Sequence, residues 1–145
     1  MERVIAKIKK STVNEIWVVL SDFTGETKLN IREYFLAGDD KGFLPTKKGI
    51  SFPLDEVGAV RDAVEALANA TEEGTACILL KMDRSEVRAA IRKYEGHTYA
   101  ELRTFIPGKD ASDEWRPTQK GFTINPRLVP LLVAAIGELE DNLEE

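Results

Sequence analysis

The sequence predicts an α+β fold made of two tandem repeats, each an antiparallel sheet of four or five strands followed by one C-terminal helix. Three observations predict it. The chain aligns with itself at a constant offset, its sheet segments alternate apolar and polar side chains, and each copy ends in a segment of helical periodicity. We expect a first repeat over residues 1–71 and a second over residues 72–145.

The repeat appears when residues 16–25 are placed over residues 87–96, an offset of 71 without gaps. The alignment continues through shared Thr, Arg and aromatic positions. After a loop one residue longer in the second copy, it resumes with Pro45-Thr46-Lys47-Lys48-Gly49 over Pro117-Thr118-Gln119-Lys120-Gly121. Chance would rarely return these identities in order, so we interpret them as a duplication.

Period-two alternation predicts a hairpin in each copy, with two-residue turns at Thr24-Gly25 and Glu95-Gly96. The hairpin strands are expected at 16–23 and 27–36 in the first copy, and at 87–94 and 98–106 in the second. Shorter extended segments are expected at 4–8, 43–45 and 49–52, and again at 75–80, 115–117 and 121–124. Each sheet therefore has at least four predicted strands.

A helix is predicted to close each copy, because apolar residues there recur at helical spacing. These residues are Val57, Val60, Val64 and Leu67, then Val129, Leu132, Val133, Ile136 and Leu139. Asn125 offers an N-cap before Pro126, and Pro53 has the nearest role in the first copy. Because roughly 70 residues form only a marginal core, we expect the copies to pack helix face against helix face.

The net charge argues against an unspecific polyanion binder, but the distribution of the charges matters more than their sum. The net charge is −5, but five of the 25 acidic residues lie within the last eight positions, and the remaining chain has as many acids as bases. Phosphate binding depends on Lys and Arg, so the placement of the 20 bases matters more than the net charge.

Catalytic and metal-binding patterns are absent from the sequence. One His and one Cys cannot build a structural zinc site, and no P-loop, GxSxG or HExxH pattern is present. We therefore expect a protein that is not an enzyme and has no cofactor or metal. Without an export signal or a long apolar run, and with a single Cys, a cytoplasmic location is expected, with nucleoid association following from the function below.

The face opposite the aliphatic one alternates aromatic and basic side chains. It shows Trp17, Phe23, Arg32 and Tyr34 in the first copy, and Arg92, Tyr94, Arg103 and Phe105 in the second. Unstacked bases can lie on aromatic rings while Arg and Lys follow the phosphates, each stack contributing about 1–3 kcal/mol. The alternative is that cross-strand aromatic and Arg pairs only stabilise a half-buried sheet. Repeat symmetry alone does not choose between these interpretations.

A second basic element precedes a glycine in both copies, as Lys47-Lys48-Gly49 and Gln119-Lys120-Gly121. A Lys before a Gly at a strand entry can offer an ammonium and a backbone N–H to a phosphate. The alternative is a plain solvated turn. Taken alone, the motif does not distinguish a phosphate-binding element from a solvated turn.

Three segments, Ser21–Gly25, Asn30–Phe35 and Pro45–Phe52, resemble the positive-cofactor-four family of transcriptional coactivators that bind single-stranded DNA. The resemblance covers most of residues 16–68 and, more loosely, 87–140. It implies a curved four-stranded sheet and a helix in each unit, with two units paired through their helices around a channel for single strands. In this chain it implies an intrachain pseudodimer.

The resemblance also implies a set of binding residues. By motif position they are Phe23, Arg32, Phe35, Lys47, Lys48, Tyr94, Arg103, Arg116 and Lys120, to which the open face adds Trp17, Tyr34, Arg92 and Phe105. The bases expected near the first hairpin are replaced by Thr24, Glu26, Glu95 and His97, and the aromatic expected at the end of the second strand is Ile106. These departures predict weaker or asymmetric binding.

The resulting hypothesis is a non-catalytic protein that binds single-stranded DNA with little sequence preference, in transcription, replication or repair. The alternative is an RNA-binding or protein-interaction module that uses the same sheet face. No membrane partner is expected. The tandem arrangement predicts a monomer with an intrachain pseudodimer, whereas a homodimer would mean that the copies pair between chains or that strand edges add together.

Overall fold

The computed structural model describes residues 2–23, 25–38, 40–82, 84–109 and 114–143, with the backbone alone at positions 23 and 80–82. Within this part the chain forms two antiparallel sheets, ordered β1-β2-β3-β4 and β5-β6-β7-β8. The first copy comprises β1 (Glu2–Lys9), β2 (Asn14–Phe23), β3 (Glu26–Leu36), β4 (Phe43–Pro53), the 3-10 turn η1 (Leu54–Glu56) and α1 (Val57–Asn69). The second comprises β5 (Gly74–Met82), β6 (Ser85–Tyr94), β7 (His97–Ile106), β8 (Arg116–Ile124), η2 (Pro126–Leu128) and α2 (Val129–Leu143). The predicted α+β fold, with two sheet-and-helix copies in one chain, is confirmed.

The two short extended segments expected after each hairpin are one bulged strand, β4 or β8. In the first copy the Thr46 hydroxyl donates to the Glu33 carbonyl at 2.8 Å and accepts the Lys48 N–H at 3.1 Å. Thr118 makes the same two contacts, with Thr104 and Lys120, at 2.9 and 3.1 Å. A side chain thus replaces the missing ladder bonds at each bulge, so the strand continues where the sequence suggested a turn.

The predicted turn and cap in the second copy are confirmed. Glu95 and Gly96 have φ values of 50° and 79°, the left-handed conformation that a tight two-residue hairpin requires. In the first copy Gly25 has φ 80°, while Thr24 lies outside the described residues. The Asn125 side chain accepts the Arg127 N–H at 3.0 Å and so caps η2, the turn that leads into α2.

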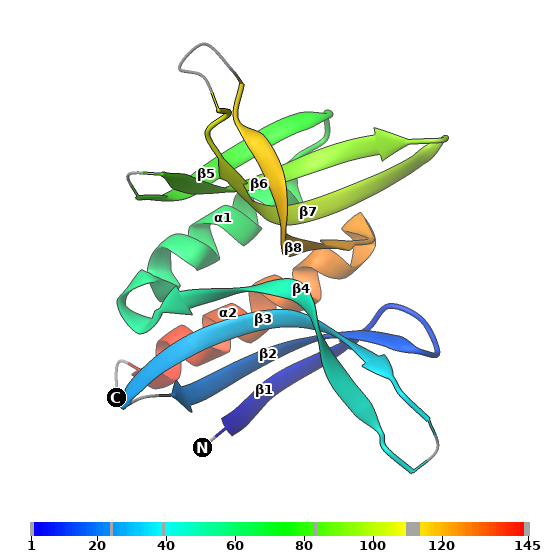
Figure 1. Ribbon diagram of the computed structural model, residues 1–145, viewed down its shortest axis with the longest axis vertical. Helices are drawn as coiled ribbons and strands as arrows, with labels where there is room; N and C mark the ends of the chain where they lie inside the picture. The colour runs from blue at the N-terminus through cyan, green and yellow to red at the C-terminus, as the bar shows by residue number, and fades with distance from the viewer. Residues whose placement is uncertain (1, 24, 39, 83, 110–113, 144–145) are drawn as a thin grey trace.

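The two helices lie side by side between the sheets (Figure 1). Each lies closest to the sheet of the other copy: α1 packs against β5 and β6, and α2 against β1 and β2. The copies are therefore interlocked as well as adjacent. None of the helices in the described ranges is long and apolar enough to cross a membrane.

One hydrophobic core contains side chains from both copies. Ile16 and Val18 of β2 are buried in it, and the alternation that predicted their direction is confirmed. Leu132 and Ile136 of α2 belong to the same cluster, whereas Val133, also expected to face inward, is only partly buried. The predicted boundary between residues 71 and 72 stays a prediction, since the copies share their core.

Candidate nucleic-acid interface

Trp17 on β2 stacks on Tyr34 of β3, with ring centroids 4.0 Å apart and planes inclined by 13°. The Trp17 indole N–H donates to the Glu15 carboxylate at 2.8 Å. The ammonium of Lys7, from β1, lies 4.3 Å from the centre of the indole ring. Three strands thus fix one aromatic pair on the face away from the helices.

The second copy repeats this arrangement with different chemistry. Arg88 aligns with Trp17, and its guanidinium lies 4.2 Å from the centre of the Phe105 ring, which aligns with Tyr34. The Arg88 Nε donates to Glu86 at 3.0 Å, and Glu86 aligns with Glu15. The repeat therefore conserves a planar group on a ring, held by a carboxylate two positions earlier on the strand.

This stacking determines which predicted aromatics face solvent. Tyr34 is 8% exposed and Phe105 is 6% exposed, because Trp17 and Arg88 cover them. Burial raises the pKa of the Tyr34 phenol above its ordinary 10.0; Glu2 raises it further, and Arg32 opposes the rise. Trp17 itself is only partly buried, so its ring is the accessible member of the pair.

Arg32 on β3 lies flat across β4 at Gly49. A methyl group at position 49 would lie 2.7 Å from Cγ and Cζ of Arg32, so only glycine leaves room for this side chain. The guanidinium donates to the Thr46 carbonyl at 2.9 Å and to the Asn30 side-chain oxygen at 3.2 Å. Both acceptors are neutral, so these bonds orient the guanidinium without compensating its charge.

Arg103 occupies the aligned place in the second copy, across β8 at Gly121. Its Nη1 donates to the Thr118 carbonyl at 2.9 Å, but its Nε pairs with Glu101 at 3.0 Å. Arg92 binds the other oxygen of Glu101 at 3.1 Å. Glu101 is 9% exposed and aligns with Asn30, so the second copy has a two-arginine cluster around one acid where the first has an amide.

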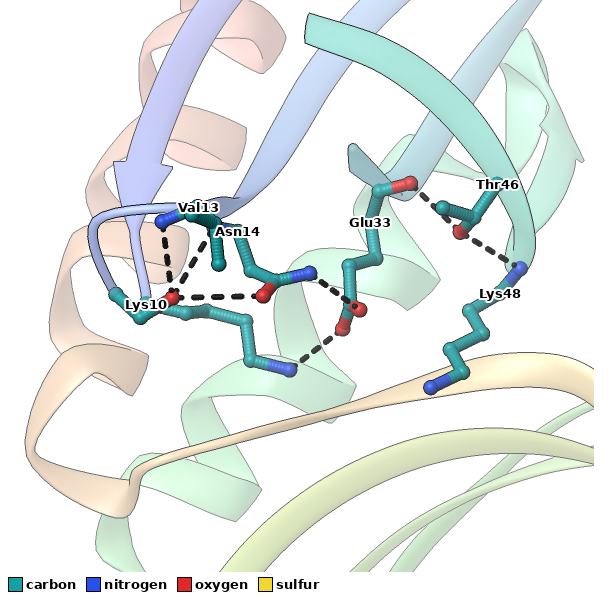
Figure 2. A network of polar contacts seen from close by, with 7 residues as sticks. Lys10, Val13, Asn14, Glu33, Thr46 and Lys48 are labelled. Atoms are coloured by element: carbon teal, nitrogen blue, oxygen red, sulfur yellow. Dashed lines mark hydrogen bonds and ion pairs between the residues drawn. The ribbon is translucent and has the colours of Figure 1, made fainter. Parts of the chain in front are cut away.

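A further buried acid distinguishes the first copy (Figure 2). Glu33 on β3 pairs with the Lys10 ammonium at 2.6 Å and accepts from the Asn14 amide at 3.2 Å. Lys10 and Asn14 come from the β1–β2 hairpin, so the three side chains tie that hairpin to β3. Glu33 aligns with Thr104, and Asn14 with Ser85, so the second copy has hydroxyls at both places.

The two copies enclose a groove of about 740 Å³, the Arg32 groove, where β4 meets β8. Its cations are Arg32 and Lys47 from the first copy and Lys120 from the second. Its hydroxyl groups are those of Ser51, Ser85, Thr104 and Thr118. Among the described residues, no carboxylate lines it. The arrangement can hold an anionic, phosphate-bearing ligand.

A smaller groove of about 470 Å³, the Arg103 groove, lies on the other side of the same seam. Its cations are Lys47, Lys48 and Arg103. Lys48 aligns with Lys120, and Arg103 with Arg32, so the two grooves correspond to each other through the repeat. Lys47, Thr118 and Gln119 line both grooves, so the two grooves adjoin each other.

The other predicted site residues lie away from the seam grooves. Tyr94 is 67% exposed at the end of β6, and Arg116 is exposed at the start of β8. Phe35 is exposed and, by strand alternation, points to the opposite face from Tyr34. The side chain of Phe23 lies outside the described residues. The structure thus brings together Arg32, Lys47, Lys48, Arg103 and Lys120, with Trp17 and Arg92 on the adjoining faces.

Sequence reasoning missed the acids that organise these faces. Glu15 and Glu86 align and lie two positions before Trp17 and Arg88, a repeated spacing that could have identified them. Val19 and Ala90 share strand parity with Trp17 and Arg88, which places them on the face opposite the aliphatic one, yet both are buried. Within the described ranges, no three His, Cys, Asp or Glu side chains lie close enough to hold a metal ion.

These features define a class: proteins in which two sheet-and-helix units pack through their helices, each with an arginine lying across a Lys-Gly bulge at a cationic seam. The model of the family described as Transcriptional Coactivator p15 (PC4) matches residues 10–63 and again 81–135, once in each copy. The chain belongs to this family, and the resemblance found in its sequence is confirmed.

Individual relatives match more distantly. A Caenorhabditis elegans protein that carries the name of an RNA polymerase II transcriptional coactivator is 30% identical over 70 residues, 43% of this chain and 56% of that protein. The chain thus covers just over half of that relative. The bacteriophage T5 homolog of the eukaryotic transcription coactivator PC4, implicated in recombination-dependent DNA replication, is 24% identical with a TM-score of 0.44, over 51% of this chain and 83% of that one. The match to the Trypanosoma brucei MRP1/MRP2 structure spans 100% of this chain and 87% of that one, with 7% identity and a TM-score of 0.44.

Proposed function

We propose that this protein binds single-stranded DNA with little sequence preference and without catalysing a reaction, in transcription, replication or repair. The observation that carries the proposal is the Arg32 groove. It gathers three cations from two copies with no lining carboxylate among the described residues, although the whole chain is acidic. Such a local concentration of positive charge favours a phosphate backbone.

The neighbouring sheet face supports a single strand over a duplex. Trp17 presents a partly exposed ring, fixed from below by Tyr34, on which an unpaired base can stack. Bases within a duplex are already stacked on each other and would have to separate first. In this proposal Tyr34 and Phe105 support the planar groups above them and do not contact the strand.

Fluorescence anisotropy with labelled single-stranded DNA, single-stranded RNA and duplex DNA, over a salt series, tests the proposal. We expect micromolar or tighter binding to single-stranded DNA, weaker binding to duplex, and affinity that falls as salt rises. Replacing both Arg32 and Arg103 by Gln should abolish the tight binding. Absence of binding even at low salt would contradict the proposal, and a preference for RNA would favour the RNA-binding alternative.

One observation favours a protein-interaction module as the second candidate. Phe35, Leu36 and Leu44 are exposed near the far end of the β3–β4 hairpin, and the Leu36 N–H binds the carbonyl of Val13, which is also exposed. Contiguous exposed apolar residues often mark contact surfaces. This candidate would replace the first if none of the three nucleic acids bound.

The proposal includes a monomeric state and a cytoplasmic, nucleoid-associated location. The interlocked helices already give each copy its partner within the chain. Sedimentation equilibrium should therefore return a mass near 16.2 kDa. A stable dimer would contradict this part of the proposal and would direct attention to the outer strands β1 and β5.

A further inference from the structure

The two seam grooves correspond through the repeat but have different linings. Each combines an arginine from one copy with the bulge segment of the other. If the copies were identical, the grooves would be identical too. Every difference between them must therefore come from positions at which the copies differ.

The first difference is whether a carboxylate compensates the positive charge of the arginine. Among the residues that the structure describes, Arg32 binds only neutral acceptors, the Thr46 carbonyl and the Asn30 amide oxygen. Arg103 forms an ion pair with Glu101, which is 9% exposed. An anion approaching Arg103 must compete with that carboxylate, whereas an anion approaching Arg32 finds an oriented guanidinium that no described carboxylate pairs with.

The second difference lies beside the arginines. Thr104 and Ser85 line the Arg32 groove. At the aligned places the first copy has Glu33 and Asn14, which bind each other and do not belong to the described lining of the Arg103 groove. The Arg32 groove is also larger, about 740 against 470 Å³, and its hydroxyls can donate to a phosphate where the other copy buries an acid.

We infer that the Arg32 groove is the primary phosphate-binding site and the Arg103 groove a weaker, secondary one. The chain then binds one strand tightly, in the Arg32 groove. A protein with two identical copies would bind two strands with equal affinity. The ligand is the phosphodiester backbone, bound by Arg32, Lys47 and Lys120. This inference rests on the proposed function, because it assigns the strand to one groove.

Matched substitutions at aligned positions test it. Lys120→Gln and Arg32→Gln alter the Arg32 groove, while Lys48→Gln and Arg103→Gln alter the Arg103 groove. With labelled oligo-dT and anisotropy at low salt, we expect the first pair each to weaken tight binding about tenfold and to lower the salt slope by about 0.7. The second pair should weaken it less than about threefold. Equal losses from both pairs would overturn the inference.

An exchange of the aligned residues gives a second readout. Thr104→Glu places an acid in the Arg32 groove and should weaken tight binding about tenfold. Glu33→Thr should leave that affinity in place and strengthen binding of a second strand, measured by stoichiometric titration. Wild-type affinity in Thr104→Glu, with unchanged circular dichroism, would overturn the inference. If the wild-type protein bound no strand at all, that result would contradict the proposed function itself and is distinguishable from the outcomes above.

Discussion

Trp17 covers Tyr34 at 4.0 Å between ring centroids, and at the aligned positions the guanidinium of Arg88 covers Phe105. What the repeat preserves is a flat group lying on a ring, while the chemistry of that group differs. An indole offers a base a stacking surface, whereas a guanidinium offers a cation as well. The two sheet faces are thus built on one plan for different contacts.

Trp17→Ala should weaken both the fold and strand binding. Removing a partly buried indole that packs on Tyr34 should lower the free energy of unfolding by about 2 kcal/mol. Loss of one base stack should weaken single-strand affinity by about 1–3 kcal/mol. Urea unfolding and anisotropy measure the two effects, with Arg88→Ala as the matched variant in the second copy. Unchanged affinity in Trp17→Ala would exclude this ring from the interface.

Tyr34 should make stability fall at high pH. Its pKa is raised in the folded state above the ordinary 10.0, chiefly by burial, so folding favours the protonated phenol. The contribution is complete below the pKa of the unfolded chain and is lost as pH rises through the folded-state pKa. Urea midpoints measured from neutral pH to above 10 should therefore decline less steeply in Tyr34→Phe. Identical declines in the two proteins would assign the loss to other groups.

Gly49→Ala and Gly121→Ala should have different effects although they are aligned. A methyl group at position 121 would lie 2.5 Å from the Leu102 carbonyl oxygen, which is backbone and cannot move aside cheaply. At position 49 it would meet the Arg32 side chain, which can rotate away. We expect Gly121→Ala to cost about 2 kcal/mol or more of stability, and Gly49→Ala to cost less but to weaken strand binding. Thermal unfolding and anisotropy separate the two, and greater destabilisation by Gly49→Ala would contradict this account.

Arg61 on α1 and Glu140 on α2 form an ion pair between the helices. Arg61 aligns with Val133 and Glu140 with Ala68. If α1 paired with a second α1, or α2 with a second α2, this ion pair would therefore not form. A double-mutant cycle with Arg61→Ala and Glu140→Ala should give a coupling of about 0.5–1 kcal/mol, because both side chains are partly exposed. The readout is the free energy of unfolding in urea. A coupling near zero would mean that apolar packing alone selects the pairing of α1 with α2.

Much of the fold could be predicted from local patterns. Alternation gave the inward direction of Ile16 and Val18, and Asn125 with Pro126 marked where the second helical segment begins. Alternation assigns a side chain to a face but not to its neighbour across the strands. That is why Tyr34 was expected on the open face while its cover by Trp17 was not foreseen.

The seam could not be predicted in the same way. Lys47 and Lys120 were candidates because each lies near a glycine, yet their shared groove depends on how β4 approaches β8. That approach belongs to the packing of the two copies against each other, in which each helix contacts the sheet of the other copy, and no local motif encodes this long-range property. The role of Glu101 was missed for a related reason. Arg103 lies two positions along its own strand, but Arg92 comes from the neighbouring strand β6 and meets Glu101 only through the register of the sheet.

Joining the interlocked copies in one chain also has a consequence for direction. In an assembly of two identical subunits, every substitution appears twice across a two-fold axis, and the axis makes the 5′-to-3′ and 3′-to-5′ courses of a bound strand equivalent. Here one copy has Glu33 where the other has Thr104 at the aligned position, so the two-fold relation between the copies is only approximate. If the protein binds a single strand as proposed, a strand laid across the seam meets a different surface when it is turned end for end, and binding with a preferred polarity is the expected result.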